Sequence, residues 1–357
     1  MKRLSDFLWP VLGLAAVGFS FYLLYGELSG MSAQSVITSL KNIGVTDWIL
    51  AGLSSLVAYA ALAWYDRIAL LHLGHKLGWM FISAVSFTTY ALSHNIGASV
   101  FSGALVRYRA YSTKGLSMAE IGVLVAFTAF TFFLGTITLG GIVLVLEPNV
   151  VRHVIHVPAF TLRVIGLGCL VFVAAYLLGS ALNHKTLVIP SKATPALKVG
   201  GYTIGPLTTP SFKLEYPHLN ITLRQLAAGP LELMGAAAII YFALPDANNP
   251  GFFVVLGVFL ASFSAALISN APGGLGVLEY VFVKSMPDIH KPDIIAALLV
   301  WRLLYLLVPL ALSGVTVLLF ERARLAEAFK KKCDAEALVA SVALEQSAAL
   351  EKSKTGP

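Results

Sequence analysis

Apolar runs long enough to cross a lipid bilayer recur along this chain of 357 residues. A helix needs roughly 20 predominantly apolar residues to span about 30 Å of hydrocarbon. Such runs occupy residues 7–25, 48–72, 118–146, 158–183, 220–244 and 294–320. Hydrophobic residues make up 57% of the chain and charged residues only 12%, which is too little charge to cover a water-soluble domain. The sequence therefore predicts an all-α polytopic membrane protein with six full spans.

Two further apolar segments, 79–106 and 251–284, are interrupted in the middle by polar and glycine-rich sequence. The first interruption reads Ser-His-Asn-Ile-Gly-Ala-Ser at 93–99, and the second reads Ser-Asn-Ala-Pro-Gly-Gly-Leu-Gly at 269–276. Each segment either crosses the membrane once or returns as a re-entrant helical hairpin. Non-helical backbone at membrane depth is tolerated only where it is buried in protein or lines a polar cavity. Re-entrant hairpins would therefore pack together at the centre of the molecule.

The distribution of basic residues decides between these topologies. If both segments crossed, seven cations after them would lie outside; if both return, the same cations join Lys2, Arg3 and the cluster at 322–332 inside. The seven are Arg107, Arg109, Lys114, Lys185, Lys192, Lys198 and Lys213. Because basic residues of short loops concentrate on the cytoplasmic side, the sequence predicts two re-entrant hairpins and cytoplasmic N- and C-termini. The apolar run after Arg3 is too long for a signal peptide, so we expect it to be retained.

The segments also recur at a nearly constant offset. Asn95 and Asn270 lie 175 residues apart, and spans 48–72 and 118–146 have counterparts at 220–244 and 294–320. Each half then holds three spans and one hairpin, and because three is odd the second half inserts upside down. Inverted repeats whose broken helices meet near the midplane are a recurrent transporter design. The predicted organisation is a first repeat at 1–146, an outer loop and the first span of the second repeat at 147–183, a cytoplasmic linker with a small β-hairpin at 184–219, the rest of the second repeat at 220–320 and a cytoplasmic helical tail at 321–357.

Two helix starts carry capping signals. Ser117 followed by Glu120 predicts a capping box before span 118–146. Asp293 is a candidate N-cap for the last span. Both signals place a helix boundary close to the start of an apolar run.

Ionisable residues inside membrane spans are costly and mark candidate functional positions. Glu232 lies halfway along 220–244, directly after Gly229 and Pro230, where the proline frees a backbone carbonyl. Arg302 lies about 12 Å into the last span, at about 1.5 Å per residue. The two residues either form a structural ion pair, or one or both face a polar cavity and meet a substrate. Asp66-Arg67 lies late in the second span, where local charge pairing or snorkelling is expected.

The hairpins add further candidates. His94 lies at the first interruption and either titrates near neutral pH or is a hydrogen-bonded structural histidine. Arg107 and Arg109 leave the first hairpin, and Lys284 occupies a comparable place in the second. These cations either anchor the topology or receive a lipid phosphate at each mouth of a path.

The second interruption is rich in glycine between Asn270 and Gly276. Tight turns and close backbone approach require glycine, and exposed amides at such a tip also form an anion-binding nest. A phosphate-binding P-loop is excluded because no Gly-Lys-Ser/Thr follows. Glu279, one or two turns after the tip, is a second candidate for a buried carboxylate.

Several functional classes are not expected. The formal charge of +7 comes from basic residues in short loops, which the positive-inside rule explains without nucleic acid. The sequence has no metal-ligand spacing, ATP site or nucleophile–base pattern, so we expect no metal, no cofactor and no enzymatic activity. Cys169 and Cys333 have no plausible disulfide partner.

Taken together, the hairpin residues resemble a known family. Ser93 to Gly97 with Arg107-Tyr108-Arg109, followed by Asn-Ala-Pro-Gly-Gly-Leu-Gly-Val-Leu-Glu at 270–279, resemble the transmembrane family of lysylphosphatidylglycerol synthase/flippases over about residues 5–325. The positions that match its motifs are Asn95, Gly97, Asn270, Pro272, Gly273, Gly274, Gly276 and Glu279. In full-length relatives this region translocates aminoacylated phosphatidylglycerol, and a separate C-terminal cytosolic domain attaches the amino acid. Because the tail here ends soon after the last span, the resemblance implies transport rather than synthesis.

The resulting prediction is a lipid translocase (flippase) of the bacterial inner membrane, with membrane phospholipid as its partner. Arginine and lysine would attract the phosphate, and Glu232 or Glu279 would accept a cationic headgroup amine. If an electrochemical gradient drives transport, Glu232 or His94 is the natural proton carrier. The rivals are a secondary transporter of a soluble solute and a non-transporting membrane subunit that positions a separate lipid-modifying enzyme. Homo-oligomerisation stays open.

Overall fold

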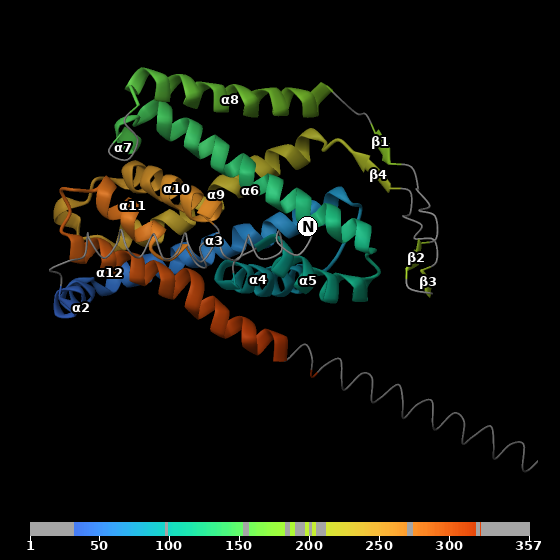
Figure 1. Cartoon of the computed structure of the whole chain (residues 1–357), viewed down its shortest axis with the longest axis horizontal. Coiled ribbons are helices and arrows are strands. Elements are labelled where there is room, and N and C mark those ends of the chain that lie inside the picture. The colour runs from blue at the N-terminus through green and yellow to red at the C-terminus, as the bar shows by residue number, and fades with distance from the viewer. Residues whose placement is uncertain are drawn as a thin grey trace, which may run out of the picture. The chain divides into compact units, whose positions relative to one another are not determined.

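The computed structural model describes residues 32–96, 99–152, 157–182, 186–189, 197–199, 202–204, 212–269, 274–318 and 322 (Figure 1). The chain divides into two compact units, residues 1–310 and 311–357. The second unit is described only at 311–318 and 322, where it is helical. Everything that follows about packing therefore concerns the first unit.

Among the described residues, six helices are long and apolar enough to cross a membrane. They are α3 (Val45–His72), α6 (Met118–Leu146), α8 (Ala159–Leu182), α9 (Leu219–Ala243), α10 (Phe252–Ser269) and a helix over Lys291–Leu318 that contains α12 (Lys291–Trp301) and the π-helical turn η4 (Arg302–Leu307). Five of these coincide with predicted spans. The predicted span 7–25 lies outside the described residues, and α10 belongs to the segment that we expected to form the second hairpin.

The other described helices are not among these six. They are α2 (Ala33–Asn42), α4 (Trp79–Ile96), α5 (Ser99–Tyr111), η1 (Ser112–Lys114), α7 (Asn149–Arg152), η2 (Asp246–Asn248) and α11 (Val277–Ser285). Helix α2 was not expected from the sequence. Its N-cap is Ser32, whose hydroxyl accepts a hydrogen bond from the backbone N–H of Ser35 at 3.1 Å. The capping box of Ser117 and Glu120 before α6 is confirmed. The expectation for Asp293 is wrong: His290 is the N-cap of α12, and Asp293 lies in its first turn.

Helices α3 and α9 form the central antiparallel pair of the bundle. Their backbones approach closely because small residues face each other: a Cβ on Gly235 would lie 3.0 Å from the carbonyl oxygen of Ser54 and the backbone nitrogen of Ala58. Further along the pair, the hydroxyl of Tyr65 lies 3.4 Å from the carbonyl oxygen of Gly229. In lipid, helices associate without a hydrophobic driving force, and small residues at their interface permit the close packing that stabilises the pair. Helix α9 also packs against α6, α8, α10 and α12.

Two pairs of consecutive helices pack against each other. Helices α4 and α5 pack against each other and form hairpin 1, and α10 and α11 form hairpin 2 (Figure 1). Hairpin 1 contacts η4 through α4, and hairpin 2 contacts α6 through α10. Each hairpin thus contacts the last long helix of the opposite half. A pair of packed helices therefore occupies each interrupted segment, whereas re-entry into the membrane stays a prediction.

The linker contains four short strands in two antiparallel pairs. Strand β1 (Thr186–Ile189) pairs with β4 (Phe212–Glu215), with Thr186 opposite Glu215. Strand β2 (Leu197–Val199) pairs with β3 (Tyr202–Ile204), with Val199 opposite Tyr202. The second pair is the small β-hairpin that the sequence analysis expected between 184 and 219.

Candidate functional site

The π-helical turn η4 is the point at which elements of both halves meet. A π-turn is rare and is frequently found at functional sites in α-helices. Three side chains donate to successive carbonyl oxygens of η4: Ser55 to Leu304 at 2.8 Å, Tyr59 to Tyr305 at 3.0 Å and Asn95 to Leu306 at 3.1 Å. The first two come from α3 and the third from the end of α4. The irregular backbone is therefore satisfied by side chains of the first half.

Glu232 is buried beside this turn. It lies two residues after Pro230 in α9 and is 2% exposed. The carboxylate accepts a hydrogen bond from the hydroxyl of Tyr305 and another, at 3.5 Å, from that of Tyr65. No cation forms an ion pair with Glu232 among the residues that the structure describes. Tyrosine hydroxyls hold this buried acid.

The possible ion pair between Glu232 and Arg302 is wrong. Arg302 instead binds Glu279 of hairpin 2, with its Nε at 2.9 Å and one terminal nitrogen at 2.5 Å from the same oxygen, Oε1. Both carboxylates bind side chains of η4, but Glu232 takes Tyr305 and Glu279 takes Arg302. Because each acid has its own partner on the turn, the pairing that we considered from sequence does not form.

Glu279 also organises the tip of hairpin 2. Its second oxygen, Oε2, accepts from the backbone N–H of Gly276 at 2.9 Å, so the side chain caps the start of α11. Gly276 and Gly274 have φ angles of +79° and +65°, which residues other than glycine rarely adopt. A Cβ on Gly274 would also lie 2.4 Å from Leu278. The predicted need for glycine is confirmed at these two positions.

His94 and Asn95 belong to the end of α4, at the tip of hairpin 1. The His94 ring stacks on Tyr305 with centroids 5.2 Å apart and lies 5.7 Å from the Tyr90 ring. Its Nδ1 is buried and has no hydrogen-bond partner among the described residues. Asn95 donates to the carbonyl oxygen of Leu306, as described above, and to that of Ala91 at 2.8 Å. Hairpin 1 therefore binds η4 directly.

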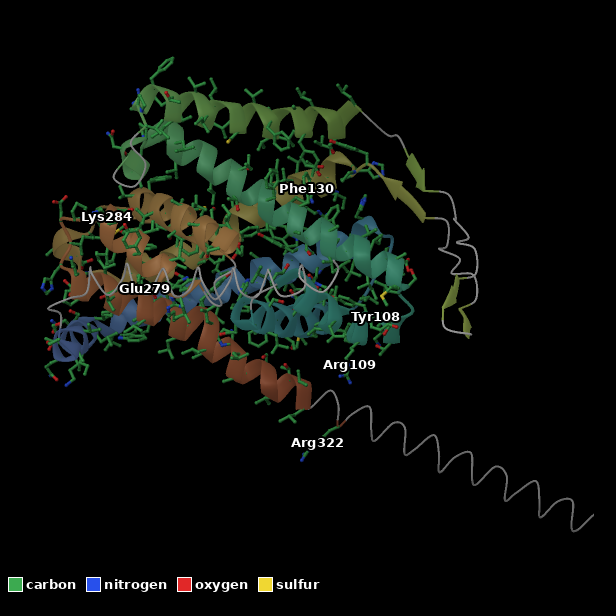
Figure 2. All side chains as sticks on the ribbon, in the orientation of Figure 1. Tyr108, Arg109, Phe130, Glu279, Lys284 and Arg322 are labelled. Carbon is green, nitrogen blue, oxygen red and sulfur yellow. The ribbon has the colours of Figure 1, made fainter. Side chains whose placement is uncertain are left out.

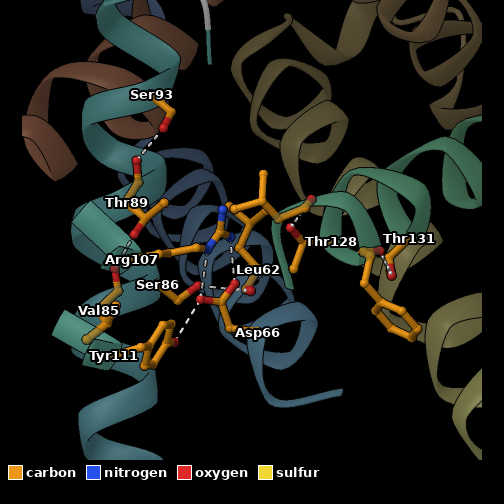
Figure 3. A network of polar contacts seen from close by, with 12 residues as sticks. Leu62, Asp66, Val85, Ser86, Thr89, Ser93, Arg107, Tyr111, Thr128 and Thr131 are labelled. Carbon is orange, nitrogen blue, oxygen red and sulfur yellow. Dashed lines mark hydrogen bonds and ion pairs between the residues drawn. The ribbon is translucent and has the colours of Figure 1, made fainter. Parts of the chain in front are cut away.

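A second ion pair holds hairpin 1 against α3 (Figure 3). Arg107 donates from Nε to one oxygen of Asp66 at 3.2 Å and from a terminal nitrogen to the other at 2.6 Å. The Tyr111 hydroxyl adds a hydrogen bond to Asp66 at 2.8 Å, and the guanidinium lies 5.0 Å from the centre of the Tyr90 ring. Local pairing of Asp66 with Arg67 is wrong, because Asp66 is turned into the bundle while Arg67 stacks on Trp79 at 4.9 Å.

The structure places the other predicted residues at the edges of the bundle or outside its described part. Arg109 and Lys284 are exposed and lie toward opposite ends of the bundle (Figure 2). Gly97, Asn270, Pro272 and Gly273 lie outside the described residues. The described part of the chain contains no group of three metal-ligating side chains. The sequence analysis missed Tyr59, Tyr65 and Tyr305; their only signal was tyrosine inside a predicted span, which is a weak one.

The chain is similar to known membrane proteins over most of its length. Residues 11–313 match the family described as lysylphosphatidylglycerol synthase TM region. The chain is 30% identical over 316 residues to the uncharacterized protein slr0712 of Synechocystis, covering 86% of this chain and 91% of that protein. It is 34% identical over 269 residues to the inner membrane protein YbhN of Escherichia coli, covering 74% and 77%. It is also 22% identical over 324 residues to phosphatidylglycerol lysyltransferase of Bacillus subtilis, covering 87% of this chain but only 34% of that enzyme. The chain is a membrane protein and belongs to the lysylphosphatidylglycerol synthase transmembrane family.

Proposed function

We propose that this protein is a lipid translocase of the bacterial inner membrane that moves a phospholipid or aminoacylated phospholipid. The observation that carries the proposal is the convergence of both hairpins on one π-helical turn. Asn95 of hairpin 1 binds the carbonyl of Leu306, and Glu279 of hairpin 2 binds Arg302, within the same six-residue turn. The name of the relative YbhN supports the inner membrane as the location.

Polar groups on and beside η4 could replace the water that a lipid headgroup loses during translocation. A headgroup that enters hydrocarbon loses its water, and each unsatisfied polar group costs several kcal/mol. η4 contributes the guanidinium of Arg302. Beside it lie the carboxylate of Glu232, which binds Tyr305, and the hydroxyl of Tyr59, which binds the carbonyl of Tyr305. Arg302 suits a lipid phosphate because its planar fork matches phosphate oxygens. Glu232 suits a cationic headgroup amine or a transported proton.

In the proposed cycle the two hairpins are re-entrant and belong to inverted repeats. The exposed Arg109 and Lys284 at opposite ends of the bundle support entry of the hairpins from opposite sides (Figure 2). Glu232 is closed off from solvent here, so a headgroup reaches it only after a hairpin separates from η4. An incoming phosphate would replace Glu279 as the partner of Arg302. This exchange would release the tip of hairpin 2 and open the path.

Reconstitution in vesicles with fluorescent phospholipids tests the proposal. The wild-type protein should move the lipid between leaflets, and Glu232→Gln and Arg302→Ala should each slow it by at least about tenfold, equivalent to a loss of about 1.4 kcal/mol. Arg163→Gln, an exposed change on α8, serves as the matched control. If pure wild-type protein moves no lipid, the proposal fails. Movement of a soluble solute without lipid would favour a secondary transporter.

A further inference from the structure

A groove on the side of the bundle lies between α3, the start of α4 and α9, apart from the hairpin tips. It has a volume of about 650 Å³ and is lined by Val57, Ala60, Ala61, Trp64, Arg67, Trp79, Arg224 and Leu231. Most of this lining is apolar, with two arginines from different helices. Such a combination of apolar wall and paired cations is unusual on a surface that faces lipid.

The two arginines lie at the same level of the groove. Helices α3 and α9 are antiparallel, with Ala58 facing Gly235 and Tyr65 reaching the carbonyl of Gly229. Continuing this register places Arg67 close to the level of Arg224. The charges therefore gather at one end of the groove, while its apolar lining continues along α3 to Val57, about 15 Å away at about 1.5 Å per residue. That length is about half of the roughly 30 Å hydrocarbon core, so it matches one leaflet.

Both arginines are held in place without a carboxylate. Arg67 stacks on Trp79 at 4.9 Å from the ring centre, and Arg224 donates from Nε to Asn220 at 3.1 Å. Among the described residues neither forms an ion pair. The neighbouring acid, Asp66, already binds Arg107. The two guanidiniums thus keep donors for an external anion.

Tryptophan indicates the depth of this charged end. Trp79 is 40% exposed and stacks on Arg67. Exposed tryptophans of membrane proteins concentrate at the level of the lipid headgroups. The anion that meets Arg67 and Arg224 is therefore at headgroup depth, with an apolar trough leading from it toward the bilayer centre.

We propose that this groove is a binding site for one anionic glycerophospholipid, with its phosphate on Arg67 and Arg224 and one acyl chain along Val57, Ala60 and Leu231. The site deepens the proposed function, because it would select the lipid before translocation, but binding does not require translocation. Two guanidiniums without a carboxylate favour a lipid with net negative charge over a zwitterionic one. The apolar trough that continues from the two arginines favours a lipid over free phosphate as the occupant.

Photolabelling of the full-length protein tests the site. The protein is reconstituted in phosphatidylcholine vesicles that contain a trace of phosphatidylglycerol with a diazirine on its acyl chain. Labelled residues should map to 57–64 and 231, and Arg67→Gln/Arg224→Gln should reduce labelling there at least about tenfold. Arg163→Gln, which removes an exposed arginine of α8, should leave the labelling unchanged. Equal labelling in the double variant and the wild type would overturn the proposal.

Competition and quenching separate the remaining outcomes. Unlabelled phosphatidylglycerol should compete for the groove, whereas phosphatidylcholine and inorganic phosphate should not; full competition by inorganic phosphate would reduce the site to a simple anion site. Brominated phosphatidylglycerol should quench tryptophan fluorescence more than brominated phosphatidylcholine does, and Trp64→Phe/Trp79→Phe should remove that difference. Both measurements are independent of transport. Labelling without lipid movement would contradict only the proposed function, and lipid movement without selective labelling would contradict only this site.

Discussion

The two hairpins are attached to the bundle by the same kind of bond with the charges exchanged. Hairpin 1 supplies the cation, Arg107, to a carboxylate on the long helix that precedes it. Hairpin 2 supplies the carboxylate, Glu279, to a cation on the helix that follows it. The side chains of the first pair are 5% and 0% exposed, and those of the second are 11% and 12% exposed.

The two ion pairs differ in how the arginine binds the carboxylate. Arg107 uses two nitrogens on two oxygens of Asp66, and Tyr111 adds a third bond. Arg302 uses two nitrogens on one oxygen of Glu279, whose other oxygen binds the backbone of Gly276. In the first pair, both oxygens of Asp66 are bound by Arg107. The second links the tip of hairpin 2 to a guanidinium of η4. Under the proposed function, a lipid phosphate would compete with Glu279 for this guanidinium.

The largest expected effect is the loss of the ion pair of hairpin 1. Arg107→Ala leaves the Asp66 carboxylate buried without its cation, and breaking one partner of a buried pair costs about 3–5 kcal/mol. Denaturant unfolding in detergent micelles should detect this loss. The matched double variant Asp66→Leu/Arg107→Met removes both charges and should recover most of the stability. A single variant within about 1 kcal/mol of the wild type would show that the pair does not lock hairpin 1.

The next effect concerns the turn of hairpin 2. Gly274→Ala meets two obstacles, a φ of +65° and the side chain of Leu278, and should lower stability by about 2–3 kcal/mol. Gly115→Ala, just after hairpin 1, has a φ of +88° with open space around its Cβ. It should cost only the backbone strain of about 1–2 kcal/mol. Equal losses in thermal unfolding would mean that the tip of hairpin 2 repacks without strain.

Part of the fold could be predicted from the sequence. Long apolar runs located five of the described spans, because hydrocarbon thickness sets helix length directly. The polar, glycine-rich interruptions located both helical pairs, because polar residues are costly inside a span and glycine permits tight turns. Re-entry and the inverted repeat stay predictions, since they concern the membrane. Helix α2 was missed because its polar sequence carries no span signal.

Partners of the charged residues could not be predicted in the same way. Glu232, Arg302, Asp66 and Arg107 stood out as costly charges, but a single sequence does not say which helices touch. The expected pairing of Asp66 with Arg67, its neighbour in sequence, was wrong. Side chains one residue apart on a helix do not face each other. The tyrosines that hold Glu232 were missed because tyrosine is common in spans without any polar role.

A third prediction asks whether the pair of hairpin 2 is used in transport. Arg302→Lys keeps the charge but replaces the fork by a point charge. One hydrogen bond to Glu279 is then lost, so stability should fall by about 1 kcal/mol. Lipid transport in vesicles should fall about fivefold, since a lysine orients a phosphate poorly. Arg107→Lys is the matched change in hairpin 1. It should lower stability more than Arg302→Lys does and lower lipid transport less. If both variants lose stability and transport in the same proportion, the two pairs do not differ in task.

The smallest expected effect tests the contact of hairpin 1 with η4. Asn95→Ala removes the hydrogen bond to the carbonyl of Leu306 and should lower stability by about 1 kcal/mol. If that contact exists only in the closed conformation, its loss favours opening and should raise the rate of lipid transport up to about fivefold. Ser55→Ala removes the bond to the neighbouring carbonyl of Leu304 from α3, which is not part of a hairpin, and should lower stability comparably without raising the rate. A rate that falls in Asn95→Ala, or rises equally in both variants, would mean that hairpin 1 does not open at η4 and that the moving element is hairpin 2 alone.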